Sequence, residues 1–99
     1  MKHYEVMYII RPNLDEEARK TLIEDMNDVL SSKGATDISV DEWGMRDLAY
    51  EIKDYKKGYY VVLQLKADTD ATQELDRVMR LREDIIRHIV IAREDKDKA

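Results

Sequence analysis

Along this 99-residue chain, segments whose apolar residues have the spacing of a strand alternate with segments whose apolar residues have the spacing of a helix. Residues 4–10 are rich in aromatic and β-branched side chains, and Arg11-Pro12-Asn13 ends the run, which predicts a strand followed by a loop. In residues 58–67 every odd position is apolar, whereas glutamine and lysine occupy even positions, so we expect a strand whose odd face lies toward the core. A last strand is predicted over residues 85–93, where both faces carry Ile or Val.

Two segments between these strands repeat apolar residues at helical spacing. The first runs from about residue 16 to residue 33, and Asp15 is placed before it as an N-cap that accepts hydrogen bonds from the first amide groups. Thr69 or Asp70 is expected to cap the second helix. We expect this helix to end near Arg80, because the same phase would otherwise bury an arginine.

The longest predicted strand spans residues 36–52, far more than the mean strand of about 5–6 residues. Gly44 interrupts its alternation in the way that a β-bulge does. A turn through residues 53–57 then leads to the next strand, so the two strands should project beyond the helices as a hairpin arm. Trp43, the only tryptophan, either packs back onto the core or stays at the surface of this arm.

The elements follow the order βαββαβ, which predicts an α+β fold of the ferredoxin-like, or split βαβ, plan. We expect a four-stranded antiparallel sheet with two helices on one face and a long hairpin between the second and third strands. The other face of the sheet stays open. Residues 1–93 are interpreted as a single domain and residues 94–99 as a short charged tail.

The composition excludes several classes of protein. With no cysteine the chain has neither a disulfide framework nor a thiolate nucleophile, which fits a reducing compartment. No apolar run approaches the roughly 20 residues of a membrane span, and the N-terminus lacks the apolar centre of a secretory signal, so we interpret the protein as cytoplasmic. The two histidines, His3 and His88, are too few for a typical zinc site, and we expect no metal and no cofactor.

The net charge of −5 argues against a generic polyanion binder, but the charges are unevenly distributed. Residues 77–99 carry seven cations and five anions. Within this segment, Arg77 and Arg80 have carboxylates nearby on the predicted helix with which they could pair. Arg82 and Arg87 flank the turn into the last strand, where neither such pairing nor core packing requires them. A cluster of arginines on one face suits an anionic ligand, above all RNA.

No constellation of nucleophile, base and acid indicates catalysis, and we expect no enzyme. The fold suggests one comparison, with acylphosphatase-like chemistry, in which an arginine after the first strand grips a phosphoryl group. Arg11 lies at that position, but the glycine-rich cradle is missing. RNA-recognition motifs begin their third-strand signature as Lys57-Gly58-Tyr59 does, yet Tyr60 and Val61 depart from it. The predicted alternation also hides Tyr59 on the core side.

Beyond Gly44, one face of the arm is expected to carry a cation and apolar side chains. An apolar stripe on a protruding edge strand is either an aggregation hazard or a partner site, and a natural soluble protein favours the partner site. The residues of this predicted partner-protein stripe are Leu48, Tyr50 and Ile52, with Arg46 on the same face. A self-associating ferredoxin-like interaction domain that binds no RNA is the alternative function.

These residues resemble the family of the bacterial small-subunit ribosomal protein six. The likeness covers essentially residues 2–93. It depends on Tyr4-Glu5, Pro12-Asn13-Leu14, Trp43-Gly44-x-Arg46-x-Leu48-Ala49-Tyr50-x-Ile52, Gly58-Tyr59-Tyr60, and Leu81-Arg82 with Arg87.

The resemblance implies a structural component of the small ribosomal subunit without catalysis or cofactor. It implies binding to the central domain of small-subunit ribosomal RNA as a heterodimer with small-subunit ribosomal protein eighteen, and a monomer when isolated. By matching position, RNA contact is expected at Lys2, Tyr4, Arg46, Tyr50, Arg80, Arg82 and Arg87. This chain has Met45, Asp47 and Glu51 where the family often carries basic or polar residues or proline, which removes positive charge from the arm.

Overall fold

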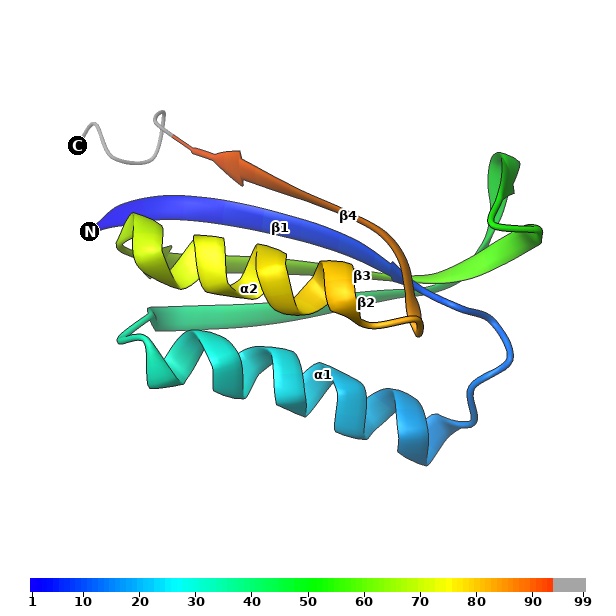
Figure 1. Cartoon of the computed structure of the whole chain (residues 1–99), viewed down its shortest axis with the longest axis horizontal. Helices are drawn as coiled ribbons and strands as arrows, with labels where there is room; N and C mark the ends of the chain where they lie inside the picture. Colours follow the sequence, from blue (N-terminus) through cyan, green and yellow to red (C-terminus); the bar gives the residue numbers. More distant parts are fainter. Residues whose placement is uncertain (94–99) are drawn as a thin grey trace.

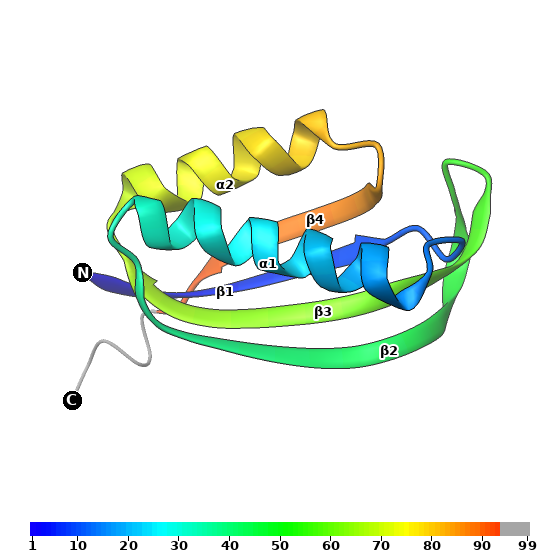
Figure 2. The same cartoon turned by 90° about the horizontal axis from the view of Figure 1, so that it is seen from below.

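A computed structural model describes residues 1–93 of the chain, and the predicted tail of residues 94–99 lies outside this part. The element order βαββαβ is confirmed, with bounds β1 Lys2–Ile10, α1 Glu16–Ser32, β2 Thr36–Ile52, β3 Tyr55–Ala67, α2 Thr69–Leu81 and β4 Ile85–Ala92. The four strands form one antiparallel sheet in the order β2-β3-β1-β4 (Figure 1). Both helices cover one face of this sheet, and the other face is open (Figure 2). Neither helix in the described part is long and apolar enough to span a bilayer.

The core lies between the sheet and the two helices. The even positions of β1 and the odd positions of β3 point into it, which confirms the predicted core face of β3. The helices contribute apolar side chains such as Met26 and Leu75, both of which are fully buried. Burying one side chain of this size stabilises the folded state by about 1.5–3 kcal/mol. None of the arm residues beyond Gly44 belongs to the buried cluster. Tyr59 is partly buried and packs against it.

The two helices begin differently. Asp15 caps α1 as predicted, because its side-chain Oδ1 accepts a hydrogen bond of 2.8 Å from the amide of Ala18. The prediction for α2 was wrong by one residue, since the N-cap is Asp68 rather than Thr69 or Asp70. Asp68 is extended, and its carbonyl accepts the first helical bond from the amide of Ala71 at 3.1 Å, so the helix follows β3 directly.

The β2–β3 hairpin contains the predicted irregularity at Gly44 and a turn that is shorter than predicted. Gly44 has a φ of +90° at a shift in the β2–β3 register, which confirms the predicted bulge. The turn contains only Lys53 and Asp54, not the five residues predicted, because both adopt positive φ values of 50° and 68°. Two such residues make the tight connection that matches the twist of paired strands, and β3 resumes at Tyr55.

A second, larger irregularity bends the arm. Between the pairs Asp47–Lys57 and Ile52–Tyr55, residues 48–51 of β2 stand opposite the single residue Lys56 of β3. Extra residues in one strand bend it and increase its twist. The end of the arm therefore curls and rises beside the start of β4 instead of continuing straight (Figure 1).

Tyr8 carries an unsatisfied hydroxyl in the core. Its side chain is fully buried, its Oη has no hydrogen-bond partner in residues 1–93, and burial raises its pKa. Replacing Tyr8 by phenylalanine keeps the ring and removes the hydroxyl, so we expect a gain of about 1 kcal/mol in the free energy of unfolding. Thermal unfolding should show a Tm higher by roughly 4–8 °C for a domain of this size. A lower Tm would mean that a buried water satisfies this hydroxyl.

Candidate RNA and partner-protein interface

The open face of the sheet carries a contiguous apolar surface. Trp43, Ile89 and Ile91 are 45%, 37% and 43% exposed, and they surround a shallow hollow that Met7 and Val62 also line. These five residues define the apolar sheet surface. The sequence offered a signal for it, because β4 is apolar on both faces and β3 has apolar residues at even positions. Only the register of β3, β1 and β4 joins these residues into one surface, and that register is not contained in the local sequence pattern.

Trp43 lies at the surface and not in the core. Its ring stacks on Tyr60 with 6.4 Å between centroids and an angle of 6°. Its Nε1 donates a hydrogen bond of 3.0 Å to Asp41, and the guanidinium of Arg46 lies 5.3 Å from the centre of the ring. Cation–π contact at an exposed site contributes about 0.5–1 kcal/mol. The first half of the arm thus presents a cation stacked on an aromatic pair.

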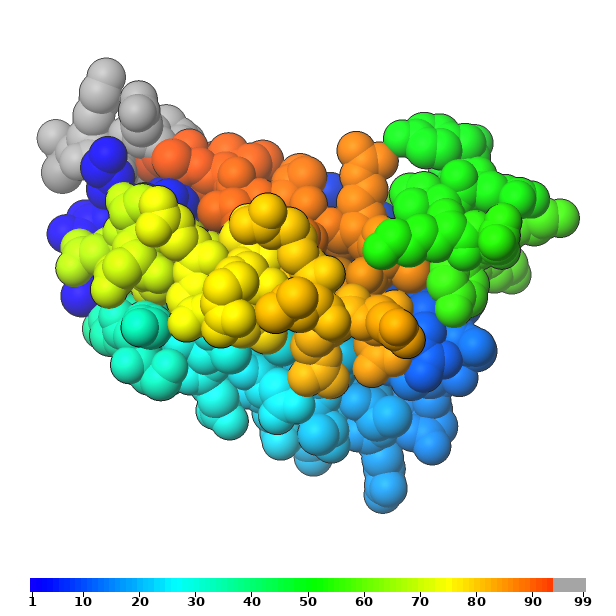
Figure 3. All heavy atoms as spheres, viewed as in Figure 1, coloured from blue at the N-terminus to red at the C-terminus, as the bar shows by residue number. Residues whose placement is uncertain are grey.

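The curled end of the arm encloses a recess against the open face of the sheet. Leu48, Ala49, Tyr50 and Ile52 line it from the arm, and Met7, Ile9, Tyr60, Arg87, His88 and Ile89 line it from the sheet. In the space-filling view the arm stands beside the first residues of β4 (Figure 3). Arg87 joins the two sides, because its Nη1 donates a hydrogen bond of 2.9 Å to the hydroxyl of Tyr50.

The predicted stripe on the arm needs a correction. Arg46, Leu48, Tyr50 and Ile52 were expected to alternate with residues of the opposite face, yet Ala49 lines the same recess as its two neighbours. The unmatched residues 48–51 break the alternation. As a result Leu48 and Ile52 are half-buried against the sheet, and only Tyr50 and Arg46 are well exposed.

The arginines of α2 are held by carboxylates. Arg80 forms an ion pair of 2.7 Å with Asp76, and Arg77 pairs with Glu74, so the predicted pairing on the helix surface is confirmed. Asp76 also bonds Nε2 of His88 at 2.6 Å, and this hydrogen bond is the main cause that holds the pKa of the carboxyl below its usual range.

Arg82 also has partners, which corrects the interpretation that nothing in the fold requires it. Its Nη1 lies 3.5 Å from Asp25 of α1, and its Nη2 lies 3.8 Å from Asp84. The side chain is one-third exposed. Arg82 therefore links the end of α2 to α1, a contact between elements far apart in the sequence.

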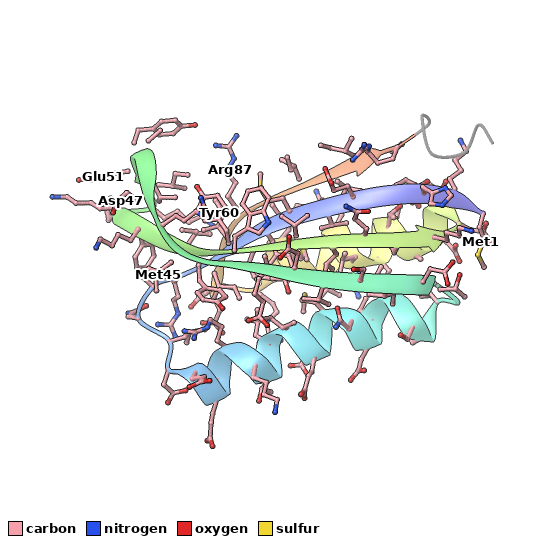
Figure 4. The ribbon with its side chains drawn as sticks, turned by 180° about the vertical axis from the view of Figure 1, so that it is seen from behind. Met1, Met45, Asp47, Glu51, Tyr60 and Arg87 are labelled. Carbon is pink, nitrogen blue, oxygen red and sulfur yellow. The ribbon has the colours of Figure 1, made fainter. Side chains whose placement is uncertain are left out.

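The expected RNA contacts do not form one cluster. Arg46, Tyr50 and Arg87 lie together at the arm end of the open face, whereas β1 begins with Lys2 at the opposite end of the sheet, where Met1 is labelled (Figure 4). Tyr4 is only 8% exposed on the core side of β1, with its hydroxyl 3.4 Å from that of Thr69. The ring of Tyr4 is therefore buried in this fold and not exposed for the expected RNA contact.

The arm departs from the family pattern by two acidic residues, Asp47 and Glu51, and both are paired with lysines. Asp47 lies 3.8 Å from Lys57, and Glu51 lies 3.9 Å from Lys56, both at the surface. Met45 is also exposed and pairs with Tyr59 across the hairpin. The lysines compensate in part for the positive charge that the arm lacks.

Residues weighed for other chemistry are engaged in the fold. The Nε of Arg11 bonds Asp84 at 2.7 Å and its Nη1 bonds Asn13 at 2.7 Å, so this side chain fixes the loop after β1. Tyr59 lies on the helix side, as predicted, under the guanidinium of Arg19 at 4.0 Å. No group of three or more potential metal ligands occurs in residues 1–93.

Comparisons with known proteins agree with this architecture. The family model described as ribosomal protein S6 matches residues 3–92. The crystal structure of 30S ribosomal protein S6 from Thermotoga maritima superimposes with a TM-score of 0.92 at 36% identity, over 98% of this chain and 92% of that one. The solution structure of the C-terminal domain of the MgtC protein from Mycobacterium tuberculosis has a TM-score of 0.58 at 18% identity, over 95% of this chain and 89% of that one, and shares the fold alone.

The resemblance inferred from the motifs is thus confirmed by a model that spans nearly the whole described domain and by a solved relative of closely similar structure. The chain belongs to the ribosomal protein S6 family, a structural and non-enzymatic family of small-subunit ribosomal components.

Proposed function

We propose that this chain binds the central domain of small-subunit ribosomal RNA as a heterodimer with small-subunit ribosomal protein eighteen. One observation carries the proposal: exposed Arg46 and Arg87 lie at one end of a sheet face whose apolar surface is covered by no element of residues 1–93. Guanidinium groups suit phosphate oxygens, because their planar donors match that geometry. Contiguous exposed apolar surface marks a protein-interaction site. The two ligands would therefore meet on neighbouring parts of one face.

The proposed RNA contacts follow from exposure. Arg46, Tyr50 and Arg87 make the primary set, and Arg80 joins it because its ion pair with Asp76 is largely exposed. An exposed ion pair contributes only about 0–1 kcal/mol, so exchanging the carboxylate for a phosphate costs little. Lys2 and the partly buried Arg82 are secondary contacts, and Tyr4 is left out.

The proposed protein contacts are centred on the apolar sheet surface, with the exposed Tyr50 at its edge. Leu48 and Ile52 contribute by holding the arm against the sheet, because they line the recess instead of projecting outward. A basic partner would also supply the positive charge for RNA binding that this chain, with a net charge of −5, lacks. Each neutralised phosphate adds roughly 0.7–0.9 to the slope of log affinity against log salt, so three arginine contacts give only about 2 to 3.

The test is a titration of a central-domain RNA fragment at several salt concentrations, with this chain alone and with protein eighteen. We expect weak, salt-sensitive binding by the chain alone and tight binding by the pair. Tight and salt-resistant binding by the chain alone would contradict the need for a partner. No binding by the pair would reject the proposed function.

Replacing Arg87 by alanine is expected to weaken RNA binding by the pair and to leave the heterodimer intact. One lost hydrogen bond to a charged group costs about 1.5–3 kcal/mol, which is roughly a 10- to 150-fold change in affinity. Arg77→Ala is the matched control, because Arg77 is an exposed arginine on α2 whose ion pair with Glu74 lies away from the open face. Loss of the heterodimer with unchanged RNA affinity would show that Arg87 faces the protein partner.

The alternative of a self-associating domain is favoured by one feature, the same uncovered apolar sheet surface. The proposed ribosomal function predicts that the isolated chain is a monomer. Size-exclusion chromatography with light scattering separates the two. A stable dimer that Ile91→Asp converts to a monomer would support self-association through the open face.

A further inference from the structure

The recess under the curled arm has the size of a site for a single ring. Its volume is about 250 Å³. Pockets that hold whole small-molecule ligands usually measure about 300–1,000 Å³, so this recess suits one planar group that enters from a longer molecule. It opens between the arm and β4, and neither α1 nor α2, the two helices of residues 1–93, contributes to its lining (Figures 3 and 4).

The lining joins apolar side chains to aromatic rings. Ile52 and Ile89 face the recess from the arm and from β4, and the side chains of Tyr50 and Tyr60 also line it. Tyr60 is itself stacked on Trp43, which limits its freedom to turn away. Aromatic side chains held in this way bind unpaired bases by stacking, a contact worth about 1–3 kcal/mol per base.

The charged groups at the recess favour an anionic occupant over a purely apolar one. Among the described residues 1–93 no carboxylate lines the recess, although the whole chain has 22 acidic residues. Arg87 lines it and uses one of its guanidinium N–H groups to bond Tyr50 at 2.9 Å. A guanidinium has five such donors, and the bond to Tyr50 fixes its position while leaving donors for another acceptor. A planar ring beside a phosphate is the combination that these groups fit.

We propose that this recess receives one unpaired nucleobase of the ribosomal RNA and that Arg87 binds the phosphate next to it. The proposal rests on the proposed function, since it names the RNA element that the same face would recognise. Sequence-specific RNA recognition generally uses unpaired bases that leave the helix, and a duplex offers none. The curl of residues 48–51 then has a binding role, because a straight arm would leave no recess.

The first experiment fills the recess without changing charge. Ala49 lines it with a small side chain, so Ala49→Phe should occupy the space meant for the base. We expect the heterodimer of this variant to bind the central-domain RNA fragment roughly 5- to 150-fold more weakly than wild type. Met45→Phe is the control, because Met45 is exposed on the same strand but does not line the recess. Unchanged RNA affinity in Ala49→Phe would overturn the proposal.

The second experiment needs neither partner nor ribosomal RNA. Methyl NMR of the full chain is recorded while adenosine 5′-monophosphate, uridine 5′-monophosphate or ribose 5-phosphate is added at low salt. Saturable shifts at the methyls of Ile52 and Ile89 are expected with the nucleotides and not with the sugar phosphate. Ile38, on another part of β2, should not shift.

The two experiments separate the possible failures. If the wild-type pair and the Met45→Phe control bind RNA, but Ala49→Phe also binds like wild type, the recess proposal fails while the proposed function stands. If Ala49→Phe weakens the heterodimer before RNA is added, the recess holds a side chain of the partner protein, and the nucleobase is excluded. If the wild-type pair fails to bind RNA, the proposed function fails, and the nucleotide titration alone decides whether the recess binds a base.

Discussion

Gly58→Val is expected to destabilise the domain by about 3 kcal/mol, which lowers the Tm by roughly 12–24 °C for a chain of this length. A Cβ at position 58 would overlap the Cγ2 methyl of Ile9, with the carbonyl oxygen of Ile10 and Cδ1 of Ile86 each 3.5 Å away. Ile9 is buried and β-branched, so its methyl cannot move aside without a change of rotamer or backbone. Denaturant unfolding and thermal melting measure the loss.

The same variant should also disturb the binding face, because Ile9 lines the recess. Lys57→Val is the control for the change of side chain, because Lys57 is the preceding residue, is exposed, and forms a surface ion pair with Asp47. Substitutions of that kind usually alter stability by less than about 0.5 kcal/mol. Equal stability of Gly58→Val and wild type would mean that the arm is not packed against β1 as described.

Ile89→Asp is expected to weaken the heterodimer by at least about 30-fold while the chain stays folded. Ile89 is 37% exposed on the open face, midway along the edge strand β4 and beside Met7 of β1. A carboxylate placed there would be desolvated without a partner when the second protein binds, and central interface residues often cost 2 kcal/mol or more when changed. Isothermal titration of the two proteins without RNA gives the affinity directly.

Val40→Asp is the matched control, since Val40 is also 37% exposed but lies on the helix side of β2, beside Arg19 and Ile23. It introduces the same charge into the same sheet on the opposite face. Heterodimer affinity should change little with Val40→Asp. The reverse result, with only Val40→Asp disrupting the pair, would place the partner on the helix side.

Local patterns were sufficient for much of this fold. The odd-position apolar residues of β3, the cap at Asp15 and the bulge at Gly44 were predicted from the sequence, because each depends on backbone geometry within a few residues. The motif block around Gly44 indicated the family, and the expected RNA contacts of the arginines come from that resemblance.

The errors lie where distant parts of the chain meet. The turn at Lys53 and Asp54 uses positive φ values that neither residue type requires, and pairing of the flanking strands selects them. Arg82 was expected to be unpaired because Asp25 is far away in the sequence. Tyr4 was assigned to RNA by position, although its even-numbered place on β1 turns it into the core.

The sequence by itself determined the order of elements, the core face of β3, the family and the presence of an aromatic and basic arm, since these follow from short-range periodicity and residue type. Only the tertiary structure decided that the arm curls, that Trp43 stays on the surface with Ile89 and Ile91, and that Arg87 meets Tyr50 across a recess. The physical reason is register: four residues of β2 opposite one of β3 set the bend, and strand pairing is fixed by long-range packing that no local pattern contains.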